Sequence, residues 1–310
     1  MPGLVGRPVT TTPTTPQPGQ PGVPSLDVEE WTFIDAGGVA WPLTRRELGY
    51  WILHGTVTGL GVTPRVKTRD DRARGGTTTR HEWVDGRLVT FEMFVRGRSR
   101  VEMLSRWRPL GRALAGGGVL RVAQADGTVR EIRAELEPGA YDTHPDRIGR
   151  HEQPTVQLWC PDGFWRDVDP VVVARTQRIR RKFLAPFMSV SSSRIPGREV
   201  VHNDGDADAW PDWLITGGMT GFTAINHTLG ASWSLDPDWD GDGPLGTGET
   251  VTVTSDPPTA TGPAGQVWWG AITGDLWPLV EGPNDIEFVL SGVSGAAGVA
   301  MTYHRWRETV

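Results

Sequence analysis

Short runs in which apolar and polar residues alternate dominate the chain, and one stretch has the period of a helix. Ser99-Arg-Val-Glu102 is a capping box, which typically opens a helix. Apolar residues then follow at helical spacing: Leu104, Trp107, Leu110 or Gly111, and Leu114. Pro109 should kink or shorten this helix, and Gly116 to Gly118 should end it. The pattern predicts one helix near 99–115, with a single stripe of apolar residues that faces the core.

The rest of the pattern has the period of β-strands. Asp126-Gly127 supplies the tight turn of a hairpin between 120–122 and 132–136, and 154–167 has the pattern of a strand ending in a turn. After Ile195 no helical period appears, and short apolar pairs recur between Gly, Pro, Asn and Asp turns. This spacing is typical of a β-sandwich or jelly roll, so we expect a mainly β chain.

Composition divides the 310 residues into four parts. Residues 7–24 hold six prolines and five threonines, which predicts an extended Thr/Pro-rich arm over 1–30. Residues 31–175 form a β domain that contains the helix, and 176–194 have the basic and Ser-rich composition of a connector. Residues 195–310 form the second, all-β domain.

Charge is unevenly placed along the chain, whose net charge is −6. Residues 1–197 carry 28 Lys and Arg against 21 Asp and Glu, whereas 198–310 carry 3 against 16. Such asymmetry suits oriented contact with neighbours of opposite charge, and it argues against nucleic-acid binding by the acidic half. The basic half lacks a helix-turn-helix pattern, so we expect no specific nucleic-acid binding.

Several function classes lack their sequence signals. No apolar run approaches the roughly 20 residues of a membrane span, and the beginning of the sequence lacks the pattern of a signal peptide. The single Cys160 can build neither an internal disulfide nor a Cys-based zinc site. The motifs of serine hydrolases, zinc proteases and P-loops are missing. We therefore expect neither an enzyme nor a cofactor.

One acidic loop has two possible ligand interpretations. Gly241, Gly243 and Gly246 fit the glycine spacing of a dinucleotide site, but the surrounding aspartates would repel a pyrophosphate. Asp236, Asp238 and Asp240 begin like an EF-hand calcium loop. Thr247 stands where that loop requires Glu, and no helices flank it. A solvated acidic loop is favoured, and calcium binding is the weaker hypothesis.

Tryptophan is concentrated in the second domain, which contains eight of the 15. Core packing is the favoured interpretation because Trp is usually largely buried. The adjacent Trp268 and Trp269 would face opposite sides of a strand, so we expect one of them to be exposed or at an interface. Exposed rings could stack on sugars, which leaves carbohydrate binding as an alternative.

Three turn motifs follow one another in the second domain. The first has Asn203-Asp-Gly205-Asp206 and then Pro211 before an alternating strand. The second is Gly248-Glu249 before the strand at 251–253, and the third is Gly282-Pro-Asn284. Together with the helix, the hairpin and the turn at 160–165, their order resembles the distal tail protein family of siphophages, which includes many minor tail proteins. The resemblance spans Trp51 to Val310, and the arm and the Asp-rich loop depart from it.

The resemblance implies both an architecture and a function. The first domain would be β-barrel-like or sandwich-like and would assemble into a homo-hexameric ring at the end of the tail tube, and a galectin-like β-sandwich would project outward. The protein would be a structural virion protein made in the host cytoplasm, a baseplate hub that joins the tail tube protein to tail-tip and receptor-binding proteins. The ring would surround the passage used by the tape measure protein and DNA.

Arg106 and Arg108 lie in the predicted helix and are candidates for a subunit interface, although a solvated face would look the same in the sequence. Two rival functions stay open. The first is an adhesion module that recognises glycans of the host cell wall. The second is a hydrolase with a β-sandwich accessory domain, which the missing catalytic motifs disfavour.

Overall fold

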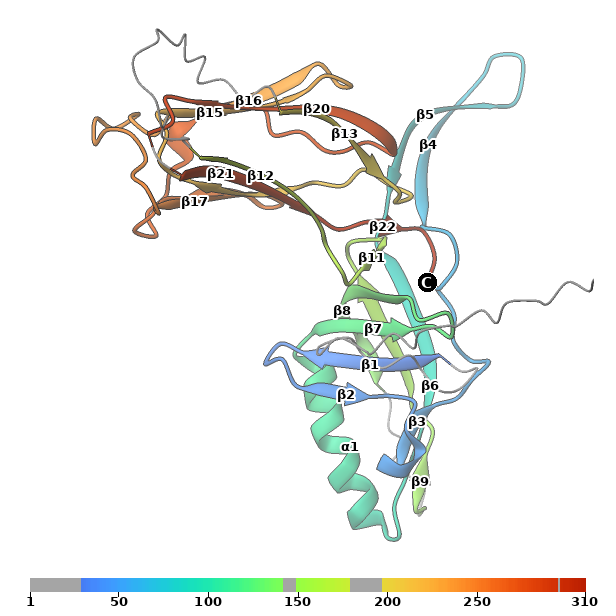
Figure 1. The fold of residues 1–310 in the computed structure, drawn as a ribbon. Helices are drawn as coiled ribbons and strands as arrows, with labels where there is room; N and C mark the ends of the chain where they lie inside the picture. Colours follow the sequence, from blue (N-terminus) through green and yellow to red (C-terminus); the bar gives the residue numbers. More distant parts are fainter. Residues whose placement is uncertain (1–28, 142–148, 179–196, 295) are drawn as a thin grey trace, which may run out of the picture.

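The computed structural model describes residues 29–141, 149–178, 197–294 and 296–310, which form two β domains side by side (Figure 1). Residues 1–28 of the predicted arm and 179–194 of the predicted connector lie outside the described residues. Within those ranges there is one α-helix, and two 3₁₀ helices accompany it: η1 (Arg46–Leu48) and η2 (Trp269–Ala271). The prediction of a mainly β chain is confirmed.

An antiparallel sheet forms the N-terminal domain, and its main path runs β2-β1-β7-β8-β10-β6-β3. Leu43 accepts a hydrogen bond from the Ile52 amide (2.6 Å) and donates one to the Trp31 carbonyl (2.7 Å). These bonds bring the two ends of the path together, so the sheet curls into a barrel-like shape. Its strands are β1 (Glu30–Asp35), β2 (Ala40–Pro42), β3 (Tyr50–Ile52), β6 (Arg87–Arg96), β7 (Gly118–Ala123), β8 (Val129–Tyr141), β9 (His151–Glu152), β10 (Thr155–Cys160) and β11 (Trp165–Asp167).

Helix α1 (Arg100–Ala115) lies where the capping box predicts it, and it contacts β1, β6 and β8. The Ser99 hydroxyl accepts a hydrogen bond from the Glu102 amide (3.2 Å), as an N-cap residue does. The helix continues past Pro109, so it is not shortened there. Its buried residues form one stripe: Met103, Trp107, Leu110, Ala113 and Leu114. No helix in the described part of the chain, α1 included, is long and apolar enough to cross a membrane.

Alternation along the strands builds the rest of this core. Val156, Leu158 and Cys160 of β10 all point inward, as the sequence predicts. The predicted hairpin joins β7 to β8 with Gly127 at φ 86°, a conformation that glycine adopts without strain. Leu120 of β7 pairs with Ile132 of β8, and both are buried.

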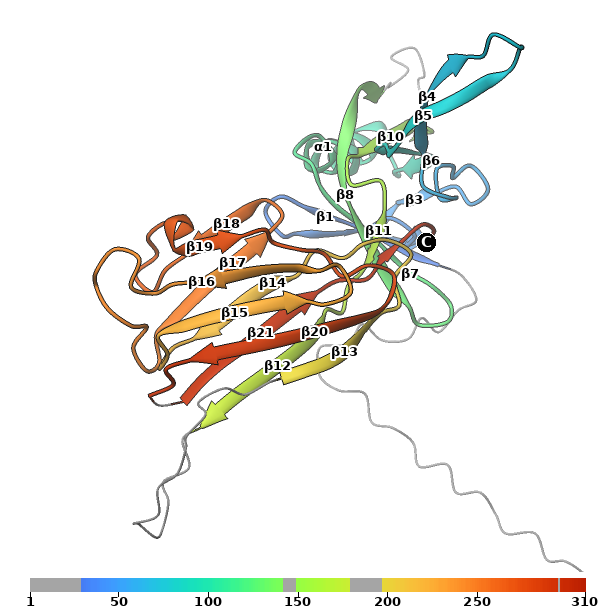
Figure 2. The same cartoon turned by 90° about the horizontal axis from the view of Figure 1, so that it is seen from above.

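The C-terminal domain is a sandwich of two antiparallel five-stranded sheets, ordered β12-β21-β14-β17-β18 and β13-β20-β15-β16-β19. Figure 1 shows the sheets as two layers, and Figure 2 shows their strands lying alongside one another beside the N-terminal domain. The strands are β12 (Val171–Arg178), β13 (Gly197–Asn203), β14 (Asp212–Thr216), β15 (Gly221–Asn226), β16 (Ala231–Leu235), β17 (Thr250–Ser255), β18 (Pro258–Thr261), β19 (Ile272–Gly274), β20 (Gly282–Ser291) and β21 (Ala296–Tyr303).

Aromatic side chains form the centre of the sandwich. The Trp213 ring meets Trp233, Trp277 and Phe288 edge to face, with ring centroids 5.1–5.7 Å apart. Edge-to-face contact is a preferred arrangement of aromatic rings. Trp268 is buried and Trp269 is 44% exposed, so one of the adjacent pair is exposed as expected. Trp269 begins η2, however, so the pair does not lie on a strand.

The boundary between the domains differs from the sequence-based division. Residues 171–175 were expected in the first domain and 176–194 in the connector, but Val171–Arg178 forms β12 of the sandwich. This strand pairs with β21 along its whole length, which gives the sandwich its outer strand. In the other direction, β22 (Trp306–Arg307) leaves the sandwich and pairs with β11. The chain therefore crosses between the domains twice.

Burial also makes a prediction for the single cysteine. Cys160 is fully buried, and burial raises the pKa of its thiol to about 12. Because the thiolate is the reactive form, we expect no reaction of the native protein with Ellman's reagent at pH 8. Unfolding in guanidinium should release one reactive thiol per chain, and rapid reaction of the native protein would contradict the position of β10 in the core.

Candidate functional site

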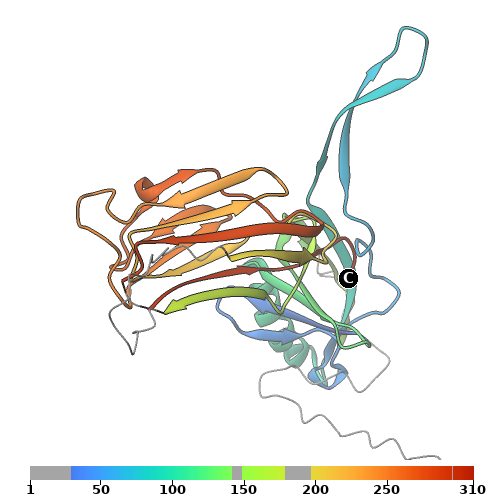
Figure 3. The same cartoon turned by 45° about the horizontal axis from the view of Figure 1, so that its top comes forward.

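A two-stranded hairpin extends beyond both domains. Strand β4 (Arg65–Asp71) pairs with β5 (Thr77–Val84) and with no other strand in the described ranges. Both strands are exposed along nearly their whole length. Figures 1 and 3 show the hairpin projecting into the surroundings.

The hairpin has almost no apolar surface of its own to bury. Ion pairs lie along it, with Lys67 Nζ 3.1 Å from Glu82 and Arg80 against Asp70. Val66 and Trp83 pair near its base, and they are 36% and 49% exposed. An isolated two-stranded hairpin is only marginally stable in water, so this segment is a candidate for contact with another chain.

Arg87 fixes the base of the hairpin. Its side chain is 1% exposed, and its guanidinium donates to four carbonyl oxygens and one hydroxyl at 2.6–3.1 Å. The acceptors are Gly59 O, Gly61 O, Thr63 Oγ1, Gly163 O and Glu308 O. Within the described residues Arg87 forms no ion pair, and its charge is stabilised by the carbonyl dipoles and by the negative charge of Glu308. Burial lowers the pKa of Arg87 from its usual value, although arginine stays protonated in proteins.

A second set of contacts joins the two domains through β22. Arg166 of β11 pairs with Trp306 of β22, and Trp165 pairs with Arg307. Farther along, the Arg130 side chain donates to the Thr309 carbonyl (2.7 Å). The last residues of the sequence thus lie on the N-terminal domain (Figure 1).

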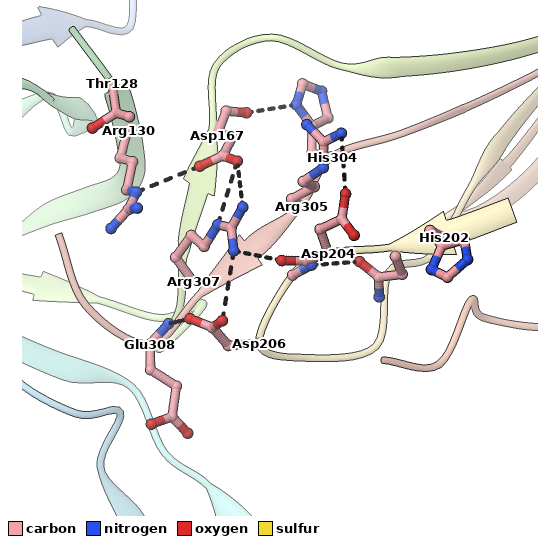
Figure 4. Close-up of polar contacts among 12 residues, drawn as sticks. Thr128, Arg130, Asp167, His202, Asp204, Asp206, His304, Arg305, Arg307 and Glu308 are labelled. Carbon is pink, nitrogen blue, oxygen red and sulfur yellow. Dashed lines mark hydrogen bonds and ion pairs between the residues drawn. The ribbon is translucent and has the colours of Figure 1, made fainter. Parts of the chain in front are cut away.

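Ion pairs surround this strand pairing (Figure 4). Asp167 of the N-terminal domain lies 3.2 Å from Arg307 and 3.4 Å from Arg130. Arg307 also lies 3.6 Å from Asp206, and Arg305 lies 3.8 Å from Asp204. Arg305 and Arg307 are two of the three basic residues after position 197, so most of the basic charge of the acidic half is located at this junction.

Glu131 of β8 carries a buried charge beside the same junction. One carboxylate oxygen accepts from Arg121 (2.7 Å) and the other accepts from Arg166 (2.6 Å). Burial alone would raise the pKa of Glu131, but these two arginines outweigh it and hold the pKa below its usual value. Because Arg166 lies on β11, this triad connects β7 and β8 to the strand that pairs with β22.

The first of the three turn motifs shapes the sandwich side of the junction. The Asn203 side chain is buried, donates to the carbonyls of Ala207 and Leu279 (both 2.9 Å) and accepts from the Gly205 amide (3.0 Å). A Cβ at Gly205 would lie 3.0 Å from the backbone of Trp306. The turn therefore presents Asp206, which accepts from the Glu308 amide (3.0 Å).

The other motif residues close neighbouring turns. Asn284 is buried, pairs with the backbone of Val280 and lies two residues from Gly282, whose φ is 87°. Asn203 and Gly282 are paired residues of β13 and β20, so the first and third motifs meet at one end of the sandwich. Elsewhere Glu249 accepts from the Gly246 amide (2.7 Å) after Gly248 at φ 89°, and the Pro211 carbonyl accepts from the Ser255 hydroxyl.

The acidic loop uses its carboxylates to hold its own backbone. Asp236 accepts from the Asp238 amide (3.1 Å), Asp238 from the Gly243 amide (2.8 Å) and Asp240 from the Asp242 amide (3.3 Å). These are local turn bonds of the kind that aspartate forms in loops. Among the described residues, no three acidic, His or Cys side chains are grouped so that they could hold a metal ion.

Arg106 and Arg108 occupy different environments on α1. Arg106 donates to the Arg96 carbonyl (2.7 Å) and to Glu102 (2.8 Å), so it is engaged within the domain. Arg108 is exposed. The structure does not bring either residue near the hairpin or the junction, and their assignment to a subunit interface stays a prediction.

Sequence reasoning missed Arg87 and the hairpin, although each left a signal. Arg87 stands in the inward register of β6 with Val89, Phe91, Met93 and Val95, so a charged residue continues an apolar alternation. The hairpin has Gly75-Gly76 followed by three threonines, a turn before β-formers. Its strands are polar on both faces, so no apolar alternation identifies them.

Replacing Arg87 should destabilise the protein strongly. Arg87→Lys keeps the charge, but it cannot reach five separated acceptors with three donors, and buried carbonyls are left without partners. We expect a loss of at least about 3 kcal/mol in the free energy of unfolding, measured in denaturant. Arg74→Lys in the exposed hairpin tip is the matched control and should change stability by less than about 0.5 kcal/mol. Equal losses of stability in the two variants would contradict the stabilising role of the Arg87 hydrogen bonds.

Glu131 should make stability depend on pH. Its pKa in the folded state is below the usual 4.5, so its stabilisation is complete above that pH and disappears as the pH falls. Glu131→Gln should lower stability at pH 7 by roughly 2–3 kcal/mol and flatten the decline below pH 5. The exposed Glu281→Gln serves as control, and an unchanged acid profile in Glu131→Gln would refute this assignment.

Comparisons with known proteins agree with the architecture described above. No protein-family model matches the sequence, and no curated protein matches it. Solved structures do match. One is the SPP1 Dit (gp 19.1) protein, described as a paradigm of the hub adsorption apparatus in phages that infect Gram-positive bacteria, with a TM-score of 0.61 and 16% identity. The match covers 90% of this chain and 99% of that chain.

A chain in the phage P2 baseplate, in its activated conformation with Ca, also matches, with a TM-score of 0.51 and 10% identity over 91% of this chain and all of that one. The same baseplate with Sr gives the same values. Each match covers about nine-tenths of this chain, so it extends over both domains. The chain therefore has the fold of SPP1 Dit, which confirms the resemblance to siphophage distal tail proteins that its sequence shows.

Proposed function

We propose that this protein is a structural hub subunit of a phage tail, a virion component that joins the tail tube to the tail tip. Six copies form a closed ring at the end of the tube, and the tape measure protein and DNA pass through it. The sandwich anchors tail-tip and receptor-binding proteins outside the ring. The protein has no catalytic role in this proposal.

The match to SPP1 Dit over nearly the whole of both chains carries the proposal. It includes the N-terminal domain, the sandwich and the order in which they follow one another. Identity of 16% supports a shared fold, and fold alone does not determine function. Surface features of this chain supply the independent support.

A closed ring of identical copies needs a heterologous interface, in which one surface of each copy meets a different surface of the next. The hairpin β4–β5 and the helix α1 lie on opposite sides of the N-terminal domain (Figures 1 and 3). We assign these two surfaces to the interface. The hairpin offers unpaired strand edges and the exposed pair Val66 and Trp83, and the helix offers Arg108.

The distribution of charge along the chain fits a ring in which the N-terminal domains make the contacts and the sandwiches lie outside. The sandwich belongs to the acidic half, and the barrel-like domain belongs to the basic half. Repulsion between acidic sandwiches favours their outward placement around a ring whose contacts are made by the basic domains. The sandwiches are then free to bind other tail components.

The mass of the protein in solution tests ring formation. One chain weighs 33.9 kDa, so a six-membered ring weighs about 203 kDa. Light scattering over increasing concentration should show a shift to that mass, with rings visible by electron microscopy. A chain that stays monomeric, and that also fails to form rings when purified tail tube protein is added, would contradict the proposal.

Two variants test the surfaces assigned to the ring. In the first, an Asn-Gly turn joins Lys67 directly to Glu82, which are paired residues, so the hairpin is shortened without a change of register. In the second, the exposed Arg108 becomes Glu. Both should remain monomeric at concentrations where the wild type forms rings. Asp240→Asn in the acidic loop is the control, and rings formed by the shortened variant would remove the hairpin from the interface.

A further inference from the structure

A cavity of about 530 Å³ lies between the two domains. The N-terminal domain contributes the turn after β10 and strand β11, and the sandwich contributes the segment before β14 and the residues before β22. Val84 at the base of the hairpin completes its rim. Ligand pockets in proteins are typically about 300–1,000 Å³, so this cavity is of suitable size for a small ligand.

Aromatic rings from both domains line the cavity. Phe164 comes from the N-terminal domain, Trp210 comes from the sandwich, and Trp306 comes from β22, which joins the two domains. Trp210 is 47% exposed, unlike the buried tryptophans at the centre of the sandwich. An exposed Trp presents a flat apolar face and one N–H donor.

Polar groups with free bonding capacity stand beside these rings. Asp208 and Asp256 form no ion pair and no side-chain hydrogen bond with any part of the chain that the structure describes. Asp162 faces them from the N-terminal domain, where burial and the charge of Asp256 raise its pKa while Arg133 and Arg166 lower it. The cavity therefore offers acceptors on the carboxylates and donors on Arg133, whereas Arg166 donates to Glu131.

We propose that this cavity binds an uncharged saccharide. A sugar ring has apolar C–H faces, which can stack on Trp210, and hydroxyl groups around its edge, which can donate to Asp208 and Asp256. Arg133 can donate to the same hydroxyls or to an acetamido carbonyl. The site goes beyond the hub function and does not depend on ring assembly.

The balance of charge selects among ligand classes. Four aspartates and two arginines line the cavity, which disfavours anionic ligands such as phosphates. The four aspartates are Asp162, Asp208, Asp212 and Asp256, and Asp212 already accepts from the Ser255 amide (3.2 Å). A basic peptide would satisfy the carboxylates but would place its charge beside Arg133 and Arg166. The hydroxyl groups of a saccharide can donate hydrogen bonds to the aspartates and accept them from the Arg133 side chain.

The experiment is a binding screen of the full-length protein on an array of neutral, amino-bearing and anionic oligosaccharides, with basic peptides printed beside them. Titration calorimetry then measures the strongest saccharide against wild type and variants. Trp210→Ala should weaken binding by at least about tenfold. Trp269→Ala removes a ring of similar exposure elsewhere on the sandwich and should change affinity by less than about twofold.

Asp208→Asn provides a second variant that preserves shape, with Asp240→Asn as its control. It should also weaken saccharide binding by about tenfold, and near-ultraviolet circular dichroism checks that each variant is folded. The proposal would be overturned if the array retained no saccharide, or if it retained only anionic saccharides, only amino-bearing saccharides or only basic peptides. Equal affinity of Trp210→Ala and wild type, or loss of binding only in Trp269→Ala, would overturn it as well.

Discussion

The buried guanidinium of Arg87 is the constraint on which the arrangement of this protein depends. A charge removed from water is costly unless every donor finds an acceptor, and here the acceptors come from three segments far apart in the sequence. These are the loop before the hairpin, the turn after β10 and the segment that follows β22. Any rotation of one segment would leave buried polar groups unpaired, so the three are fixed relative to one another.

The junction built around this point explains the turn motif at Asn203. The buried Asn203 amide shapes a turn whose aspartates reach the arginines next to β22. Strand pairing between β11 and β22 fixes the orientation of the end of the chain on the N-terminal domain. The buried Glu131 holds β11 in place through its hydrogen bond from Arg166. The first of the three turn motifs that carry the family resemblance therefore shapes the contact between the domains.

The sandwich and the hairpin β4–β5 differ in what stabilises them. The sandwich has a dense aromatic core and is stabilised by its own packing. The hairpin has no core and consists of polar strands with exposed edges. The fixed base sets the direction of the exposed hairpin in the single chain, which fits the proposed contact of the hairpin with another copy.

The sequence by itself determined the features that local chemistry controls. The capping box at Ser99, the turn at Gly127 and the inward alternation of β10 each depend on neighbouring residues, so they could be predicted. Tertiary structure alone decided the rest. Arg87 meets residues 76 and 221 positions away, β12 joins the sandwich through β21, and the cavity forms only where the two domains meet. No local pattern encodes which distant backbone groups will satisfy a buried charge, because that choice belongs to the packing of the whole chain.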